Sequence, residues 1–431
     1  MLSVLEHINA FLWGGPVLLF LLFVHLYFTL HTRFIQRKLP HALKLSLRKE
    51  SGAGDMSRFA SLATLLAATL GTGNIVGVST AIAYGGPGAV FWCWITGVLG
   101  MATSYAECYL GICFRKKQPN GSYLGGPMYV WEDGLHRKGM AKLFCYFTLA
   151  ASFGVGCSTQ ARAVTEATTS LWNLPLLPVG LVTAGIVGLV LLGGAKSIGK
   201  ICSFLVPCMG IFYLAACGVL LAIIRNFLWD ALMLILKSAF SFRSVTGGIL
   251  GSSFLLAARY GIARGLFTNE AGLGSAPIAA ASSSVSSPKT QSLVMMSATF
   301  WDTVVMCGIT GLVIVSTYLK QPSLFWGRTA GDYTAASFST LPFAGDTLLG
   351  IAIVAFAIAT LIGWSFFGEK AAEYLFGPSG TVTYRLCYVF MIFVGSQLSL
   401  HLVWELCDFL NALMAIPNLL SLLLLRKHIS T

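Results

Sequence analysis

Long apolar stretches recur along the whole chain, and short polar segments separate them. A helix needs about 20 apolar residues to cross a hydrocarbon core of roughly 30 Å, and on this criterion the pattern predicts eleven membrane-spanning helices. They cover residues 11–31, 57–84, 88–113, 143–169, 176–195, 200–224, 247–284 (interrupted), 289–318, 345–367, 382–400 and 403–425. Because no linker divides them, we predict an all-α integral membrane protein with a single transmembrane domain, residues 1–431.

Two of the predicted helices carry glycine and polar residues at their centres. The second contains Gly71-Thr72-Gly73-Asn74, and the seventh contains Asn269 to Ser275 followed by Pro277. Glycine leaves helical dihedrals at little cost, and a broken helix presents free N–H groups on one side of the gap and free carbonyls on the other. The N–H groups suit a carboxylate, the carbonyls suit a cation such as Na+, and Asn74 adds a neutral oxygen ligand. Two alternatives remain open: a Gly73-x-x-x-Gly77 packing face in the second helix, and a helix end at the membrane interface in the seventh.

The two interrupted segments resemble each other. Residues 71–83 (GTGNIVGVSTAIA) and 272–284 (GLGSAPIAAASSS) both read Gly-x-Gly-polar followed by small residues. Five helices separate their starts, so the second copy enters the membrane from the opposite side. This pattern predicts two inverted five-helix repeats, residues 57–224 and 247–425, behind an extra first helix at residues 11–31. Coincidence between two glycine-rich helices is equally compatible with the residues.

Isolated polar side chains occur at membrane depth in four further helices. Gln160 lies two residues before Arg162 in the fourth, whereas Thr360 and Trp364 of the ninth are four residues apart and share one helix face. The third and eighth helices hold one carboxylate each, Glu107 and Asp302. Each of these residues alone is more often a packing residue than a ligand. Their occurrence beside two broken helices favours a binding site, in which Trp364 would form an apolar wall.

Composition and charge support a membrane protein and exclude other classes. The chain is 56% hydrophobic and 10% charged, against about 25% charged in an ordinary soluble domain. If the N-terminus is outside, 20 of the 28 Lys and Arg lie in inside segments, so the positive-inside pattern places the C-terminus in the cytoplasm. This placement argues against nucleic acid as a partner. The sequence has no phosphate-binding loop, nucleophile elbow or metal-spaced histidine pair, so we do not expect an enzyme.

Six stretches of the chain resemble the alanine or glycine:cation symporter family, also called sodium:alanine symporters. They are TRFIQRKLPHALK (32–44), AATLGTGNIVGVSTAIAYGGPGAVFW (67–92), GSYLGGPMYV (121–130), ARGLFTNEAGLGSAPIAAA (263–281), GWSFFGEKAAEYLFG (363–377) and NALMAIPNLL (411–420). The resemblance implies a multi-pass transporter of a prokaryotic inner membrane that couples uptake of alanine or glycine to Na+. Because one chain with an internal repeat can build a pathway alone, we expect the monomer to be functional. It also implies the leucine-transporter fold, with the second and seventh helices as its discontinuous pair.

The resemblance further implies roles for individual residues. The N–H groups of Thr72 and Gly73 would bind the substrate carboxylate, and Asn74 would bind Na+. Another Na+ site would consist of the carbonyls of Ala67 and Leu70 with the hydroxyl of Thr360. The substrate's amino group and small side chain would be surrounded by Gln160, Asn269, Gly272, Gly274, Thr360 and Trp364. Arg162 departs from the family pattern, which usually has an uncharged residue there.

Two other transport classes remain open from the sequence. A proton-coupled or exchange transporter would use one of the intramembrane carboxylates of Glu107, Glu270 or Asp302 as its titrating group. A passive channel would line its pore with the same polar residues and would equilibrate its substrate without accumulating it.

Overall fold

Helices make up almost the whole of the computed structural model, which describes residues 2–48, 56–118, 121–241, 254–285, 287–398 and 400–430. The α-helices are α1 (Leu2–Gly14), α2 (Pro16–His31), α3 (Leu39–Ser46), α4 (Arg58–Thr69), α5 (Val76–Gly85), α6 (Gly88–Cys113), α7 (Pro127–Tyr129), α8 (Lys138–Phe153), α9 (Thr159–Trp172), α10 (Leu176–Leu192), α11 (Gly194–Ile223), α12 (Leu228–Ala239), α13 (Phe254–Asn269), α14 (Ala276–Ala281), α15 (Pro288–Thr299), α16 (Gly308–Lys320), α17 (Tyr333–Phe338), α18 (Gly345–Phe376), α19 (Pro378–Gly395) and α20 (Leu400–Leu424). Short 3-10 helices are η1 (Ile35–Lys38), η2 (Thr72–Asn74), η5 (Arg225–Phe227), η7 (Pro322–Phe325), η8 (Ala330–Asp332) and η9 (Arg426–His428), and π-helical segments are η3 (Val130–Gly134), η4 (Gly154–Ser158) and η6 (Phe300–Cys307). Two short strands, β1 (Lys116–Lys117) and β2 (Tyr123–Leu124), pair antiparallel.

The helices coincide with the apolar segments of the sequence. Every one of the eleven segments contains a helix, and the third, predicted at 88–113, is α6 itself. Within the described residues, seven helical stretches are long and apolar enough to cross a membrane, and α4 with η2–α5, bent by 61°, makes an eighth. The chain is thus a multi-pass, all-α membrane protein. The count of eleven spans stays a prediction, and residues 247–253 of the seventh lie outside the described residues.

The first predicted helix differs from its expected bounds. We predicted one helix over residues 11–31, whereas the structure has two helices, α1 and α2, that begin at Leu2. The division falls at Gly15, because Pro16 has no N–H to donate to a carbonyl in the preceding turn.

The ninth predicted helix is longer than the apolar pattern indicated. We predicted its end at residue 367, whereas α18 continues to Phe376. Polar side chains beyond 367 find partners on the protein: Glu369 pairs with Arg385 at 2.7 Å, and Lys370 pairs with Glu373 at 2.9 Å. A search for apolar residues therefore stops before the helix does.

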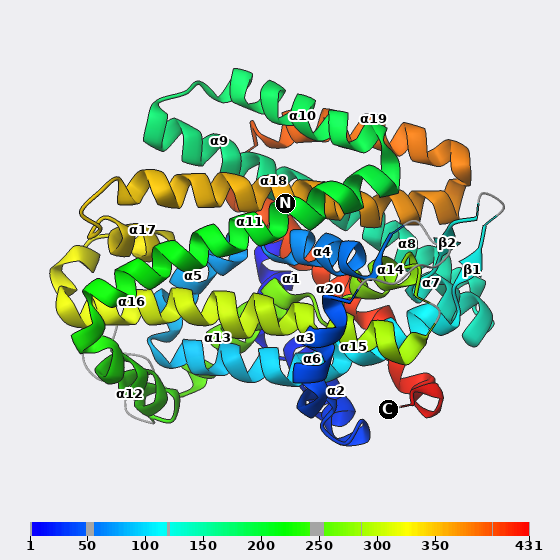
Figure 1. Cartoon of the computed structure of the whole chain (residues 1–431), viewed down its shortest axis with the longest axis horizontal. Helices are drawn as coiled ribbons and strands as arrows, with labels where there is room; N and C mark the ends of the chain where they lie inside the picture. The colour runs from blue at the N-terminus through cyan, green and yellow to red at the C-terminus, as the bar shows by residue number, and fades with distance from the viewer. Residues whose placement is uncertain are drawn as a thin grey trace.

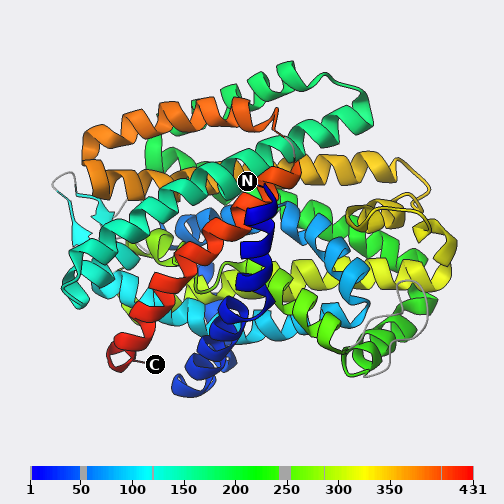
Figure 2. The same ribbon diagram turned by 180° about the vertical axis from the view of Figure 1, so that it is seen from behind.

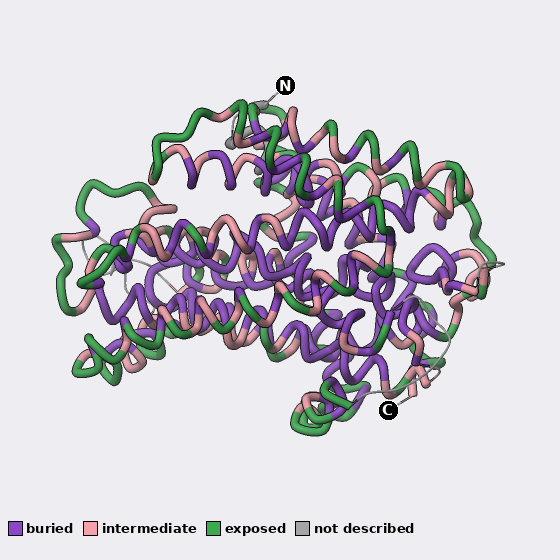
Figure 3. Tube along the Cα trace, turned by 45° about the horizontal axis from the view of Figure 1, so that its top comes forward, coloured by how far each residue is buried: buried purple, intermediate pink, exposed green. Residues whose placement is uncertain are grey.

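Helix α18 crosses the middle of the molecule, with α10 and α19 on one side and α6 and α13 on the other (Figure 1). Figure 3 shows that the central helices are buried over most of their length, whereas the outer helices alternate between buried and exposed turns. The exposed positions on the outer helices include large apolar side chains, such as Leu189 on α10, Phe204 on α11 and Leu386 on α19. Large apolar side chains exposed along outer helices are typical of helices that face lipid.

Candidate functional site

The second predicted helix is broken where its glycines lie. Helix α4 ends at Thr69, and the Leu70 N–H still bonds to the Leu66 carbonyl at 2.8 Å. Gly71 is then extended, and α5 begins only at Val76. The side-chain oxygen of Asn74 accepts a hydrogen bond from the Gly71 N–H at 3.0 Å, so Asn74 caps the break from within. The predicted interruption is therefore present. The two glycines of the alternative packing face also lie against α13, because a Cβ on Gly73 would lie 3.0 Å from Thr268 and one on Gly77 would lie 2.8 Å from Arg264.

The seventh predicted helix is broken as well. Helix α13 ends at Asn269, α14 begins at Ala276, and three residues between them have left-handed dihedrals: Glu270 (φ 53°), Gly272 (φ 92°) and Gly274 (φ 89°). The Asn269 side chain accepts from the Ala271 N–H at 2.9 Å. All residues from Asn269 to Ser275 are buried, so this break is not a helix end at an interface. We call residues 269–275 the α13–α14 turn.

The two breaks meet at the centre of the protein. A Cβ on Gly73 would lie 3.0 Å from Thr268 at the end of α13, so the backbones approach closely there. A Cβ on Gly71 would lie 2.9 Å from the Thr360 hydroxyl of α18 and 3.6 Å from the Gln160 amide of α9. Because both positions are glycine, α9, α13 and α18 can approach the backbone of the first break, at η2, closely.

Most predicted site residues lie around these breaks. The Thr72 hydroxyl is 3.4 Å from the Gln160 amide oxygen, and the Thr360 hydroxyl is 3.4 Å from the Leu70 carbonyl oxygen. Ala67 is buried two residues before the end of α4. The oxygens gathered at the end of α4 are neutral carbonyl and hydroxyl groups, which suit a hard cation. In the part of the chain that the structure describes, no group of three His, Cys, Asp or Glu side chains is placed to hold a metal ion.

Trp364 lies at the α13–α14 turn. Its indole N–H donates to Glu270 at 2.9 Å, and the other Glu270 oxygen accepts from the Ser275 hydroxyl at 2.6 Å. A Cβ on Gly156 would lie only 2.2 Å from the Cβ of Trp364, so the π-helical segment of the fourth helix packs directly on this side chain. The indole is fully buried and fixed on two sides.

Two further carboxylates hold the breaks. The Asp302 carboxylate, on the π-helical segment η6, accepts from the Asn74 amide at 2.7 Å. Glu107 of α6 accepts from the Gly274 N–H at 3.2 Å and from the Asn418 amide at 2.9 Å. The sequence marked both acids as unusual in a membrane but did not predict their partners. Asn418 was missed, although its stretch, NALMAIPNLL, is one that carries the family resemblance.

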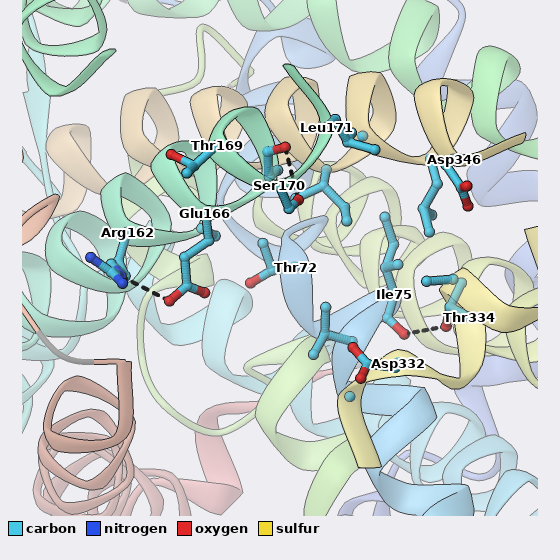
Figure 4. Close-up of a pocket in the computed structure, with 18 of the residues that line it drawn as sticks. Thr72, Ile75, Arg162, Glu166, Thr169, Ser170, Leu171, Asp332, Thr334 and Asp346 are labelled. Carbon is cyan, nitrogen blue, oxygen red and sulfur yellow. Dashed lines mark hydrogen bonds and ion pairs between the residues drawn. The ribbon is translucent and has the colours of Figure 1, made fainter. Parts of the chain in front are cut away.

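A cavity of about 780 Å³ lies on the α5 side of the first break (Figure 4). Thr72 reaches it from the break, and its walls carry charged side chains from other elements: Arg162, Glu166, Asp332 and Asp346. Arg162 donates to Glu166 at 2.8 Å, so the arginine that departs from the family pattern forms part of the cavity wall. The volume exceeds what a small amino acid needs.

The opposite end, where α4 begins and α14 ends, is closed by hydrogen bonds. Met56 forms a bridge with the segment after α14: the Ser284 N–H donates to the Met56 carbonyl at 2.8 Å. The guanidinium of Arg115 donates to three carbonyls of the same segment, at 2.8 to 3.0 Å. The Ser61 hydroxyl of α4 donates to the Ala279 carbonyl of α14 at 2.6 Å. The two half-helices α4 and α14 are thus tied to each other at this end.

Two interrupted helices, an access cavity at one end and a seal at the other describe a transporter. The sequence model of the sodium:alanine symporter family matches residues 1–431. The chain belongs to the sodium:alanine symporter family. It is 44% identical over 431 residues to the sodium/alanine symporter AgcS of Methanococcus maripaludis, covering 98% of this chain and 94% of that protein. It is 43% identical over 430 residues to an uncharacterized transporter of Haemophilus influenzae, covering 99% and 94%.

The fold of this sodium:alanine symporter family member is also found among solved structures. The chain is similar to the crystal structure of MhsT in complex with L-phenylalanine, with a TM-score of 0.60 and 14% identity over 86% of this chain and 88% of that one. The protein therefore has the leucine-transporter fold, as the resemblance implied. It is an amino-acid transporter of the membrane and not an enzyme.

Proposed function

We propose that this family member is a Na+-coupled symporter that takes up alanine, glycine or both across the inner membrane of a prokaryote by alternating access. The observation that carries the proposal is that two broken helices meet at the centre of the protein. Free N–H groups of the first break lie beside Thr72 and Gln160, and its free carbonyls lie beside the hydroxyl of Thr360. One gap thus offers donors to a carboxylate and oxygen acceptors to a cation.

Na+ would bind at the end of α4. Its ligands would be the carbonyls of Ala67 and Leu70 with the Thr360 hydroxyl, which already lies 3.4 Å from the Leu70 oxygen. Asn74 would serve a second ion through its remaining lone pair, because within the described residues its amide oxygen accepts one hydrogen bond, from Gly71.

The substrate would bind between the breaks. The N–H groups of Thr72 and Gly73 would take its carboxylate, and the polar groups of Gln160, Thr360 and the α13–α14 turn (Asn269, Gly272, Gly274) would surround its amino group. Trp364 would close the side-chain end. Because Gly156 and Glu270 fix the indole, the space for a side chain is limited, which favours substrates as small as glycine and alanine.

The proposed architecture has eleven spans: an extra first helix (11–31) and two inverted repeats (57–224 and 247–425). The N-terminus would be outside, the C-terminus cytoplasmic, and the monomer functional. In this orientation the 780 Å³ cavity opens outward, and the Met56–Ser283 bridge and Arg115 close the cytoplasmic end. Release of substrate into the cell requires these bonds to break while the outer cavity closes.

Proton coupling is the second candidate, because Glu107, Glu270 and Asp302 are all buried at membrane depth. Accumulation of labelled glycine, L-alanine and D-alanine in proteoliposomes distinguishes the candidates when sodium and pH gradients are imposed separately. Each positive charge that enters down 100 mV contributes about 2.3 kcal/mol, enough for roughly fifty-fold accumulation. Accumulation driven by a pH gradient without sodium would contradict sodium symport, and equilibration without accumulation would indicate a channel.

A further inference from the structure

The first two helices run beside the last one. Figure 2 shows α1 and α2 next to α20 at the back of the molecule. The Asn9 amide donates to the backbone carbonyl and side-chain oxygen of Glu405, each at 2.7 Å, and the Trp13 indole donates to the Asp408 carbonyl at 2.9 Å. The helix pair α1–α2 is therefore bound to a transport helix by polar contacts, beyond what a simple membrane anchor would need.

Helix α2 also bonds to α6. The ring of His25 is fully buried, and its Nδ1 lies 2.8 Å from the hydroxyl of Thr103. The other ring nitrogen, Nε2, has no partner in the part of the chain that the structure describes. Burying an imidazole with one unsatisfied nitrogen costs free energy, and a leucine at this position would avoid that cost. We therefore look for a functional role of the bond that His25 makes to α6. Thr103 lies one helical turn before Glu107, on the same face of α6.

Side chains of α2, α6 and α20 enclose the α13–α14 turn. A Cβ on Gly272 would lie 2.9 Å from the Leu419 side chain of α20, 3.0 Å from the Leu21 side chain of α2 and 3.7 Å from Thr103. The same turn is hydrogen-bonded from behind, since the Asn418 amide donates to the Gly272 carbonyl at 2.9 Å. Helix α2 thus completes the wall behind the turn.

We propose that α1–α2 is a working part of the substrate site, in which Leu21 and His25 are positioning residues for the α13–α14 turn. Leu21 fills the space behind Gly272, and the His25–Thr103 bond sets the register of α6, so that the Glu107 carboxylate meets the Gly274 N–H. The inference rests on the proposed function, because the turn is one wall of the proposed substrate site. Neither residue touches the substrate.

The test uses the full chain in proteoliposomes and compares four single variants with a control and one double variant. His25→Leu and Thr103→Val each remove the bond between α2 and α6, Leu21→Ala opens space behind Gly272, and His25→Asn keeps a polar atom near the position of Nδ1. Thr32→Val is the matched control, because Thr32 directly follows α2 and its buried hydroxyl bonds, among the described residues, to the Phe28 carbonyl of α2 alone, at 2.6 Å.

The first measurement is the alanine concentration for half-maximal uptake. It should rise about threefold to tenfold in His25→Leu, Thr103→Val and Leu21→Ala, the size expected for one lost buried contact. The maximal rate should change little, and the double variant H25L/T103V should be no worse than either single variant, because both remove the same bond. His25→Asn should recover most of the wild-type value. Wild-type values in the three disruptive variants would overturn the proposal.

The second measurement does not depend on the substrate. Hydrogen–deuterium exchange of the backbone over residues 269–275 should be faster in His25→Leu and Leu21→Ala than in Thr32→Val, because the turn loses its support. If wild-type protein fails to accumulate alanine or glycine but the exchange differs as stated, the proposed function is wrong and the positioning role stands. If exchange in this turn is unchanged in folded variants, the positioning role is wrong, whatever the substrate.

Discussion

Asn74 is the residue at which ion binding and helix geometry depend on the same side chain, so its replacement by alanine is the most informative single change. Its amide oxygen accepts from the Gly71 N–H at 3.0 Å, and its amide nitrogen donates to the Asp302 carboxylate at 2.7 Å. Asn74→Ala removes both bonds and the proposed ion ligand together. We expect the sodium concentration for half-maximal alanine uptake to rise steeply.

The size of the effect follows from the bonds. A hydrogen bond to a charged group contributes about 1.5–3 kcal/mol, and a buried donor left unsatisfied costs about 1–3 kcal/mol. The Gly71 N–H keeps one contact, to the Thr69 carbonyl at 2.9 Å, so the lower part of the second range applies. If about 2 kcal/mol of the total opposes ion binding, the half-maximal sodium concentration rises roughly thirtyfold.

Two variants that exchange the amide and the carboxylate of Asn74 and Asp302 separate the effect on helix geometry from the effect on ion binding. Asn74→Asp places two carboxylates in contact, and their repulsion should abolish uptake. Adding Asp302→Asn restores one carboxylate and one amide across the same 2.7 Å contact and should recover uptake at least in part. Proteoliposomes with a fixed alanine concentration and varied external sodium provide the assay. An Asn74→Ala protein that is folded, transports alanine and shows an unchanged sodium response would refute the assignment of Asn74 to an ion site.

Three further changes test other parts of the site. Gly156→Ala would place a methyl 2.2 Å from the Cβ of Trp364, so alanine affinity should fall at least about tenfold, whereas Gly185→Ala, with open space around it, should have no effect on alanine binding. Thr360→Val keeps the shape but removes the hydroxyl 3.4 Å from the Leu70 carbonyl oxygen, so the sodium concentration for half-maximal uptake should rise about tenfold, and the alanine concentration should rise as well because Thr360 also lines the proposed substrate site. Arg115→Gln removes the guanidinium that donates to three carbonyls at the closed end, so sodium-free efflux of preloaded alanine should rise severalfold, and unchanged efflux would count against a gate there.

The sequence predicted which segments are helices because a membrane imposes one dominant rule, that about 20 apolar residues must lie together. It failed where that rule is not the deciding one. The C-terminal end of α18 depends on partners such as Arg385, and the division of α1 from α2 depends on the missing N–H of Pro16; neither affects hydropathy. The π-helical segments η4 and η6 left no hydropathy signal either, although η6 carries Asp302.

The breaks themselves were predictable from glycine and polar residues, but their internal capping was not. Asn74 and Asn269 each use a side-chain oxygen to accept a backbone N–H released by their own break, at 3.0 Å and 2.9 Å. Pattern alone could mark these amides as polar groups in an apolar segment, which fits a ligand and a cap equally well. Whether such an amide acts as a cap, a ligand or both depends on which atoms surround the rest of the side chain, and only the fold determines those neighbours.

The fold also gives one shared role to three of the buried carboxyl groups. Each of the three holds a broken helix by a bond to another element: Asp302 through Asn74, Glu270 through Trp364, and Glu107 through Asn418 and Gly274. A hydrogen bond loses strength steeply when its geometry changes. Carboxylates at these three places therefore make the breaks rigid in one arrangement and sensitive to rearrangement, which is what a helix that must bind its substrate firmly and then release it requires.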